Sequence, residues 1–317
     1  MNIFSAFNRP SDGSPLDSSR QSLVRAAGHA LSVVAPGTAS RLAAWMWSSP
    51  PRTGRDGLLP EGAQLLVLAV AGRVARGAIW YPHVGAGVRV LVQHGWGGSI
   101  AKMNTLVAAL LAEGATVVAF DAFGHGATGT GRHGWRQSSL IEMSDLVIAA
   151  NQEVGPFDAV VAHSAGAPAV ARALRHGMQV KRAAFIAPLV EPLSQAHMLS
   201  KALGLTSAVS ARWPDVLLER FHATRSDIDM ISPCDQAMTR TLIIQDQDDR
   251  FSQSEGARRL HRAWTGSELV ETHGLGHVRI QHDSGVVRRV AEFVVEKDLM
   301  PADHERAGLR DPRHGAV

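Results

Sequence analysis

Short apolar runs alternate with amphipathic segments along most of this 317-residue chain. Residues 64–70 and 73–81 have the composition of two strands, and Ala71-Gly72 between them predicts a hairpin. From there on, buried strands and helices follow one another, which predicts an α/β fold with a parallel sheet covered on both faces. The further strands are expected at 88–93, 116–120, 157–162, 182–186, 241–245 and 268–271. The helices are expected at 102–113, 139–154, 254–263 and 284–296, and an Ala-rich helical segment follows residue 166.

Two stretches depart from this alternation. Residues 1–60 form an N-terminal extension in which apolar positions at helical spacing, between 21 and 48, predict two amphipathic helices. We expect these helices to pack on the domain. The less favoured alternative is a helix pair that contacts a membrane surface or gates access of the substrate, because the polar face carries little basic charge. Residues 190–235 are mostly helical and predict a small lid over the sheet. We therefore expect one main domain over 61–299, followed by a flexible polar tail at 300–317.

Composition narrows the classes of function. The chain has 32 Lys and Arg residues and 29 Asp and Glu residues, so its positive charge is only slightly in excess. The arginines are also dispersed, which argues against nucleic acid as a partner. The single cysteine, Cys234, allows no intrachain disulfide and lies outside any small-residue turn that would expose a nucleophile. No apolar run is long enough to span a bilayer, and residues 1–15 lack the pattern of a secretory signal. We expect a soluble cytoplasmic protein of unknown oligomeric state.

The stretch 157–170 carries the candidate nucleophile. A β-branched run leads into Ala162-His163-Ser164-Ala165-Gly166 and then directly into a helical segment. Small residues around Ser164 are what a sharp strand-to-helix turn requires, because larger side chains would collide with the neighbouring strand and helix. Such a turn holds the serine hydroxyl at the carboxyl edge of the sheet, close to a helix N-terminus.

An activated serine needs a base and a group that orients the base. Asp246, Asp248 and Asp249 follow the strand at 241–245; Asp249 is our first choice because it lies far enough beyond the strand to turn back over the edge. Asp248 is the second choice, and Asp246 is expected to be a turn residue that binds its own backbone. His277, in Gly-Leu-Gly-His before the last helix, is preferred over His273 as the base.

The turn around Ser164, the Asp249 loop and Gly276-His277 resemble motifs of the α/β-hydrolase superfamily. So does the stretch His94-Gly95-Trp96-Gly97-Gly98, and the four motifs are spread over residues 63–296. The resemblance implies an α/β-hydrolase fold and an oxyanion hole made of the backbone N–H groups of Trp96 and Ala165. It also implies that 120–126 is a structural loop beside the site. Two positions depart from the family's pattern. Ala162 stands where the turn around the serine usually has its first glycine, and Ser252 stands where a proline often follows the acid.

The reaction that we expect is hydrolysis of a carboxylic ester through an acyl-enzyme on Ser164, with His277 as base and then acid and with Asp249 orienting it. We expect no cofactor. The alternatives are thioester or amide hydrolysis, acyl transfer, or a binding protein with an inert triad. Apolar lid side chains suggest a small-molecule substrate with an apolar acyl portion, unless they only pack the lid. They are Leu199, Leu203, Leu205, Val209, Trp213, Leu217 and Leu218.

Three histidines at strand ends raise the question of a metal site. His94, His125 and His163 all follow predicted strands and can lie close together, near Asp121. Their spacing matches neither H-x-H nor H-E-x-x-H. We interpret them as residues that hold the loops around the site, and we expect no metal.

Overall fold

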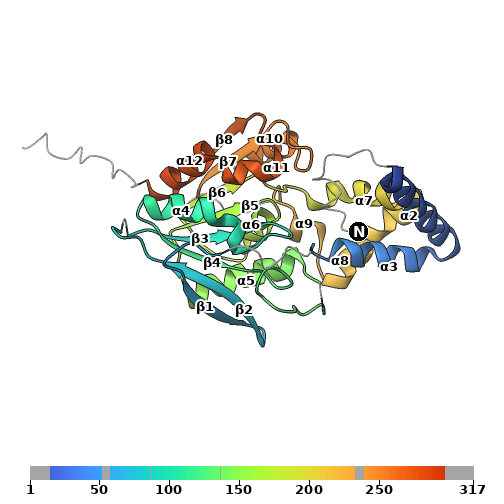
Figure 1. Cartoon of the computed structure of the whole chain (residues 1–317), viewed down its shortest axis with the longest axis horizontal. Coiled ribbons are helices and arrows are strands. Elements are labelled where there is room, and N and C mark those ends of the chain that lie inside the picture. Colours follow the sequence, from blue (N-terminus) through green and yellow to red (C-terminus); the bar gives the residue numbers. More distant parts are fainter. Residues whose placement is uncertain (1–14, 52–57, 86, 136, 233–238, 297–317) are drawn as a thin grey trace, which may run out of the picture.

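The structure is a computed structural model that describes residues 15–51, 58–85, 87–135, 137–232 and 239–296 (Figure 1). The expectations for Cys234, for residues 1–14 and for the tail at 300–317 lie outside the described residues. Within the described residues, no helix is both long and apolar enough to cross a membrane.

Within these ranges, eight strands form a single sheet in the order β1-β2-β4-β3-β5-β6-β7-β8. β1 (Gln64–Val70) and β2 (Arg73–Trp80) form the predicted hairpin, and β2 is also antiparallel to β4. All other pairs are parallel, which confirms the mostly parallel sheet. The remaining strands are β3 (Arg89–Gln93), β4 (Thr116–Phe120), β5 (Ala159–His163), β6 (Arg182–Ile186), β7 (Arg240–Asp246) and β8 (Ser267–Thr272). Because parallel strands end at one edge, the loops after β3, β5, β7 and β8 gather there.

Helices cover both faces of the sheet. Every residue of β5 is buried, and successive side chains such as Val160 and Val161 enter two different hydrophobic cores. α5 (Leu140–Glu153), α6 (Gly166–Arg175) and α10 (Ser254–Ala263) complete the first core, and α4 (Asn104–Ala112) and α12 (Ser284–Val295) complete the second. The helix expected from residue 102 begins as a 3₁₀ turn, η1 (Ile100–Met103), before α4. The other short elements are η2 (Pro192–Gln195), α9 (Arg225–Ile228), α11 (Gly276–Arg279) and η3 (Ile280–His282).

The N-terminal helices and the lid helices pack against one another. α2 (Pro15–Val34) and α3 (Pro36–Trp47) lie beside α7 (Ala196–Leu203) and α8 (Ser207–Phe221) at one end of the molecule (Figure 1). At Gly28, a Cβ atom would collide with the carbonyl oxygen of Leu203, so glycine permits the close approach of α2 to α7. The rings of Trp47 and Trp213 lie 5.3 Å apart. We refer to these four helices as the cap.

The cap has a hydrophobic core of its own. Leu199, Leu203 and Trp213 are buried in it together with Ala43 and Ala44 of α3. The packing of the N-terminal helices on the rest of the chain is therefore confirmed. Leu199, Leu203 and Trp213 therefore pack the lid helices against the N-terminal helices, which is the simpler of the two roles considered for them. The division of the chain into domains stays a prediction.

Candidate active site

Ser164 occupies a crowded left-handed turn between β5 and α6. Its backbone φ is 53°, a conformation that non-glycine residues rarely adopt. Gly166 is required here, because a Cβ atom would lie 2.7 Å from the carbonyl oxygen of His94. Gly95 is required on the other side, because its Cβ atom would lie 2.8 Å from that of Ser164. The small residues predicted around the serine thus correspond to actual close contacts.

The structure brings Ser164, His277 and Asp249 together, although they are far apart in sequence. The Oγ atom of Ser164 lies 2.8 Å from Nε2 of His277. On the other side of the imidazole, Nδ1 lies 2.7 Å from Oδ2 of Asp249. If Nδ1–H donates to the carboxylate, Nε2 is free to accept the serine proton. The side chain of Asp249 is fully buried, and that of His277 is 12% exposed.

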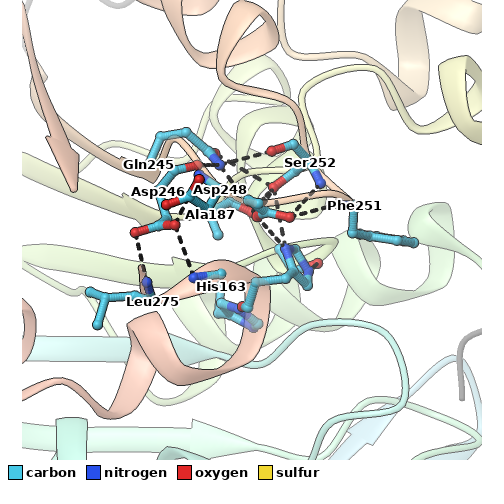
Figure 2. A network of polar contacts seen from close by, with 12 residues as sticks. His163, Ala187, Gln245, Asp246, Asp248, Phe251, Ser252 and Leu275 are labelled. Atoms are coloured by element: carbon cyan, nitrogen blue, oxygen red, sulfur yellow. Dashed lines mark hydrogen bonds and ion pairs between the residues drawn. The ribbon is translucent and has the colours of Figure 1, made fainter. Parts of the chain in front are cut away.

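Several donors surround the carboxylate of Asp249. Its Oδ1 accepts hydrogen bonds from the N–H groups of Phe251 at 2.7 Å and Ser252 at 3.0 Å. Its Oδ2 accepts a further bond from the Ser252 hydroxyl at 2.7 Å; Figure 2 shows Ser252 and Phe251 side by side in this network. Burial alone would raise the pKa of Asp249, but the hydrogen bond and charge of His277, with the Ser252 and Phe251 donors, outweigh burial and lower it. Asp249 therefore stays ionised and can stabilise an imidazolium.

The competing candidates lie elsewhere. Asp248 is exposed, and its carboxylate accepts a hydrogen bond from the N–H of Gly274 at 2.8 Å. His273 is exposed as well. Neither contacts Ser164 among the hydrogen bonds of the described residues. Of the candidate acids and bases, His277 contacts the serine in the described structure, and Asp249 contacts His277.

Asp246 does more than sequence reasoning assigned to it. It is the last residue of β7, it is completely buried, and it does bind its own turn by accepting the N–H of Asp248 at 3.0 Å. It also accepts the N–H groups of Leu275 at 3.0 Å and Gly276 at 2.9 Å, just before His277. The signal that could have revealed this role is an acid at the end of an otherwise apolar strand, because a buried carboxylate requires donors.

The histidines at the strand ends hold loops, as the sequence predicted. Nε2 of His94 accepts the N–H of Ala122 at 3.0 Å, and its Nδ1 lies 2.7 Å from the carbonyl of Gly95. His125 binds the carbonyl of Phe123 at 3.0 Å. Burial lowers the pKa of His125 to about 3, so that its ring is neutral. Among the described residues, no group of three or more His, Cys, Asp or Glu side chains is arranged to hold a metal ion.

The loop at 120–126 is a structural support. The Oδ1 of Asp121 accepts the N–H of Ile100, and its Oδ2 accepts the N–H of Ala127, both at 2.7 Å. A Cβ atom at Gly126 would collide with the Asp121 carboxylate. Asp121 thereby joins this loop to the loop after β3, which carries Trp96.

Two backbone donors adjoin the serine. Ala165 directly precedes α6, and Trp96 lies in the turn closed by the Gly98 N–H to Gly95 carbonyl bond of 2.9 Å. Within the described part of the chain, no hydrogen bond uses the N–H of Ala165 or of Trp96. Both groups are therefore available to an oxyanion, in line with the expectation from the resemblance.

A narrow apolar cavity of about 50 Å³ opens beside these two residues. Trp96 and Ala165 line one part of it, and Leu217 and Leu218 of α8 line another. Trp47, at the end of α3, also contributes to the wall, so that the N-terminal extension reaches the site. Sequence reasoning gave a gating role for these helices only as the less favoured alternative and did not single out Trp47, because nothing local in α3 indicates which side chains it will meet.

Comparisons with known proteins agree with this architecture. Residues 86–240, which include Ser164 but neither Asp249 nor His277, match the family model described as serine aminopeptidase, S33. No curated protein matches the chain.

Several solved structures share the fold. Est1E from Butyrivibrio proteoclasticus, with ferulic acid bound, is 16% identical, with 73% of this chain and 96% of that chain covered and a TM-score of 0.57. The Pyrococcus furiosus esterase Pf2001 is also 16% identical, with 78% and 96% covered and a TM-score of 0.57. The thioesterase domain from the curacin biosynthetic pathway is 17% identical, with 74% and 99% covered and a TM-score of 0.50. At these identities the likeness shows the fold alone, and it is the fold that the motifs predicted.

Proposed function

We propose that this chain, which has the α/β-hydrolase fold and matches a hydrolase family model over residues 86–240, is a serine hydrolase that cleaves a carboxylic ester through an acyl-enzyme on Ser164. The observation that carries this proposal is the continuous chain of hydrogen-bonding contacts from Ser164 Oγ through His277 to Asp249, at 2.8 and 2.7 Å. Both distances are within the range in which a base can take a proton from a nucleophile.

The first half-reaction forms the acyl-enzyme. Ser164 Oγ attacks the ester carbonyl carbon while His277 Nε2 takes the hydroxyl proton. The negative charge that develops on the carbonyl oxygen is stabilised by the N–H groups of Trp96 and Ala165. The bond from carbon to the alcohol oxygen then breaks, and His277 returns the proton to the leaving alcohol.

The second half-reaction regenerates the serine. His277 takes a proton from a water molecule, whose oxygen attacks the acyl carbon, and then protonates Ser164 Oγ as the acid leaves. Asp249 keeps the imidazole in the tautomer with hydrogen on Nδ1 and stabilises the imidazolium that forms twice in each cycle.

The cavity indicates a short apolar acyl group. Its wall is almost entirely apolar, and it adjoins the two oxyanion donors, where the acyl carbon of a bound ester has to lie. Its volume of about 50 Å³ is only a few times the roughly 10–15 Å³ that one water molecule needs. We therefore propose a small-molecule ester with a short apolar acyl chain as the preferred class of substrate.

Steady-state hydrolysis of p-nitrophenyl butyrate tests the proposal. Ser164→Ala and His277→Ala are each expected to lower kcat by about 10⁴-fold or more, as for other enzymes in which a triad acts as a unit. The butyryl thioester and the butyryl anilide are assayed in parallel. Full activity in Ser164→Ala contradicts the acyl-enzyme, and turnover of the thioester or anilide without the ester contradicts ester hydrolysis.

A further inference from the structure

The loop that carries His277 is fastened to the sheet by a second buried carboxylate. Asp246 ends β7, and Thr272 ends β8; the two residues are paired in the sheet, and the loop to His277 starts after Thr272. The Asp246 side chain is completely buried. In Figure 2 its carboxylate faces Leu275, on the opposite side of the network from Ser252.

All four hydrogen bonds of this carboxylate fix the two loops at the sheet edge. Oδ2 accepts the Thr272 hydroxyl at 2.8 Å and the Leu275 N–H at 3.0 Å. Oδ1 accepts the N–H of Gly276 at 2.9 Å and that of Asp248 at 3.0 Å. The donors therefore include the N–H groups of the two residues before His277, as well as that of Asp248 in the loop that carries the triad acid.

The loop itself has little intrinsic rigidity. Gly274 and Gly276 adopt left-handed φ values of 76° and 63°, and a Cβ atom at either would meet nothing within 4 Å. Glycines have the largest conformational freedom of all residues, so a loop with two of them needs external contacts to hold one conformation. Asp246 supplies such contacts to the N–H groups of Leu275 and Gly276, directly before His277 in the chain.

We propose that Asp246 is a positioning residue for His277: its carboxylate fixes the 272–276 loop so that Nε2 lies in line with Ser164 Oγ. This inference rests on the proposed function, because it assigns Asp246 a role through His277 alone. A misplacement of about 1 Å at a reacting group can cost about 100-fold in rate, so a loosened loop affects catalysis before it affects the fold.

The ionisation state of Asp246 fits this role. Burial would raise its pKa, but the hydrogen bonds from Gly276, Thr272, Leu275 and Asp248 outweigh burial and lower the pKa. Among the described ion pairs, none involves Asp246, and the four hydrogen-bond donors to its carboxylate are neutral groups. The anchor is therefore present throughout the neutral and mildly acidic range.

A double-mutant cycle separates positioning from a general structural effect. Wild type, Asp246→Asn, His277→Ala and the double variant are assayed with p-nitrophenyl butyrate, after circular dichroism has shown that each is folded at the assay temperature. Asp246→Asn is expected to lower kcat by roughly 30- to 100-fold with KM changed less than about twofold. In the His277→Ala background the same change is expected to alter the residual rate by less than about twofold.

Asp248→Asn is the matched control. This carboxylate is two residues further along the same loop than that of Asp246, but it is exposed. Among the described side-chain contacts it accepts a hydrogen bond from Gly274 alone, and we expect less than about a threefold effect.

An unchanged kcat in Asp246→Asn, or the same loss in both backgrounds, overturns the positioning role. If His277→Ala retains full activity, the proposed function itself fails, which is a different outcome. If Asp246→Asn does not fold, Thr272→Val removes one of the four donors and is expected to lower kcat about 3- to 10-fold; an unchanged kcat in that variant overturns the proposal.

Discussion

His163 donates a hydrogen bond of 3.0 Å from Nε2 to the main-chain carbonyl of His277. The residue before the candidate nucleophile thus holds the backbone of the candidate base, and the two rings lie 5.2 Å apart. Burial and the charge of His277 lower the pKa of His163 to about 3, so its ring stays neutral during catalysis. Two groups outside the triad therefore hold the main chain at His277: Asp246 binds the N–H groups of Leu275 and Gly276 just before it, and His163 binds its carbonyl.

His163→Phe is expected to lower kcat by about 3- to 10-fold while KM stays nearly constant, because the ring volume remains but the carbonyl loses its donor. Steady-state kinetics of the folded variant checks this expectation. The acidic limb of the pH profile should stay in place, because His163 does not titrate above about pH 4. A shift of that limb by a full unit would show that His163 titrates with the reaction.

Ser252→Ala is expected to lower kcat by about 3- to 10-fold. Its hydroxyl, 2.7 Å from Asp249 Oδ2, shares that oxygen with His277 Nδ1, so its removal takes away one of the donors that hold this oxygen against the imidazole. The acidic limb of kcat/KM should also move upward, because a more basic Asp249 stabilises the imidazolium more strongly. Ser254→Ala is the control, since that hydroxyl binds the carbonyl of Asp246, at 3.3 Å, and not the triad. Equal behaviour of the two variants would contradict the account.

Trp47→Ala is expected to lengthen the acyl group that is accepted. The indole forms part of the cavity wall, and its removal opens space beside Leu217. The ratio of kcat/KM for p-nitrophenyl octanoate to that for the butyrate should rise about 10-fold or more, since each buried methylene contributes about 0.8 kcal/mol. Trp45→Ala, which changes an indole 43% exposed on the same helix, should leave the ratio unchanged. A ratio that rises equally in both variants would contradict the assignment of Trp47 to the acyl site.

Acidification should destabilise the fold. His125 and His163 are buried with pKa values of about 3, whereas an unfolded histidine titrates near 6.5. Between these values the unfolded chain binds more protons, so the free energy of unfolding falls as the pH falls below about 6.5. Each residue contributes up to about 1.4 kcal/mol per pH unit in this window.

Urea denaturation at pH 7.5, 6.0 and 5.0 measures this loss as a decreasing midpoint. His125→Gln should show a smaller decrease than wild type, because the unfolded chain then has one fewer histidine that takes up a proton only when released from burial. A midpoint that is constant or rises towards pH 5.0 would contradict the neutral buried state of these rings.

Local sequence patterns predicted the sheet and the turn around Ser164 because both depend on near neighbours. The alternation of buried strands and helices determines a parallel sheet, and the crowding around a strand-to-helix turn leaves room only for small residues such as Gly166. Chain order and the distance from a strand end were enough to select Asp249 and His277.

The contacts that depend on tertiary structure could not be predicted. The meeting of α3 with α8, which places Trp47 at the cavity, depends on which of several apolar faces pack together. The role of Asp246 depends on loop amides 29 and 30 residues further along the chain. Sequence spacing carries no information on how a glycine-rich loop turns back onto a neighbouring strand.

The most direct test of the account is labelling with a fluorophosphonate, read by intact mass, on wild type and on Ser164→Ala. The account predicts a single adduct on wild type and none on Ser164→Ala, and strongly slowed labelling of His277→Ala and Asp249→Asn, because the hydroxyl is nucleophilic only while its base is in place. An adduct that persists in folded Ser164→Ala, or its absence from folded wild type that hydrolyses esters, would contradict the claim that Ser164 is the nucleophile.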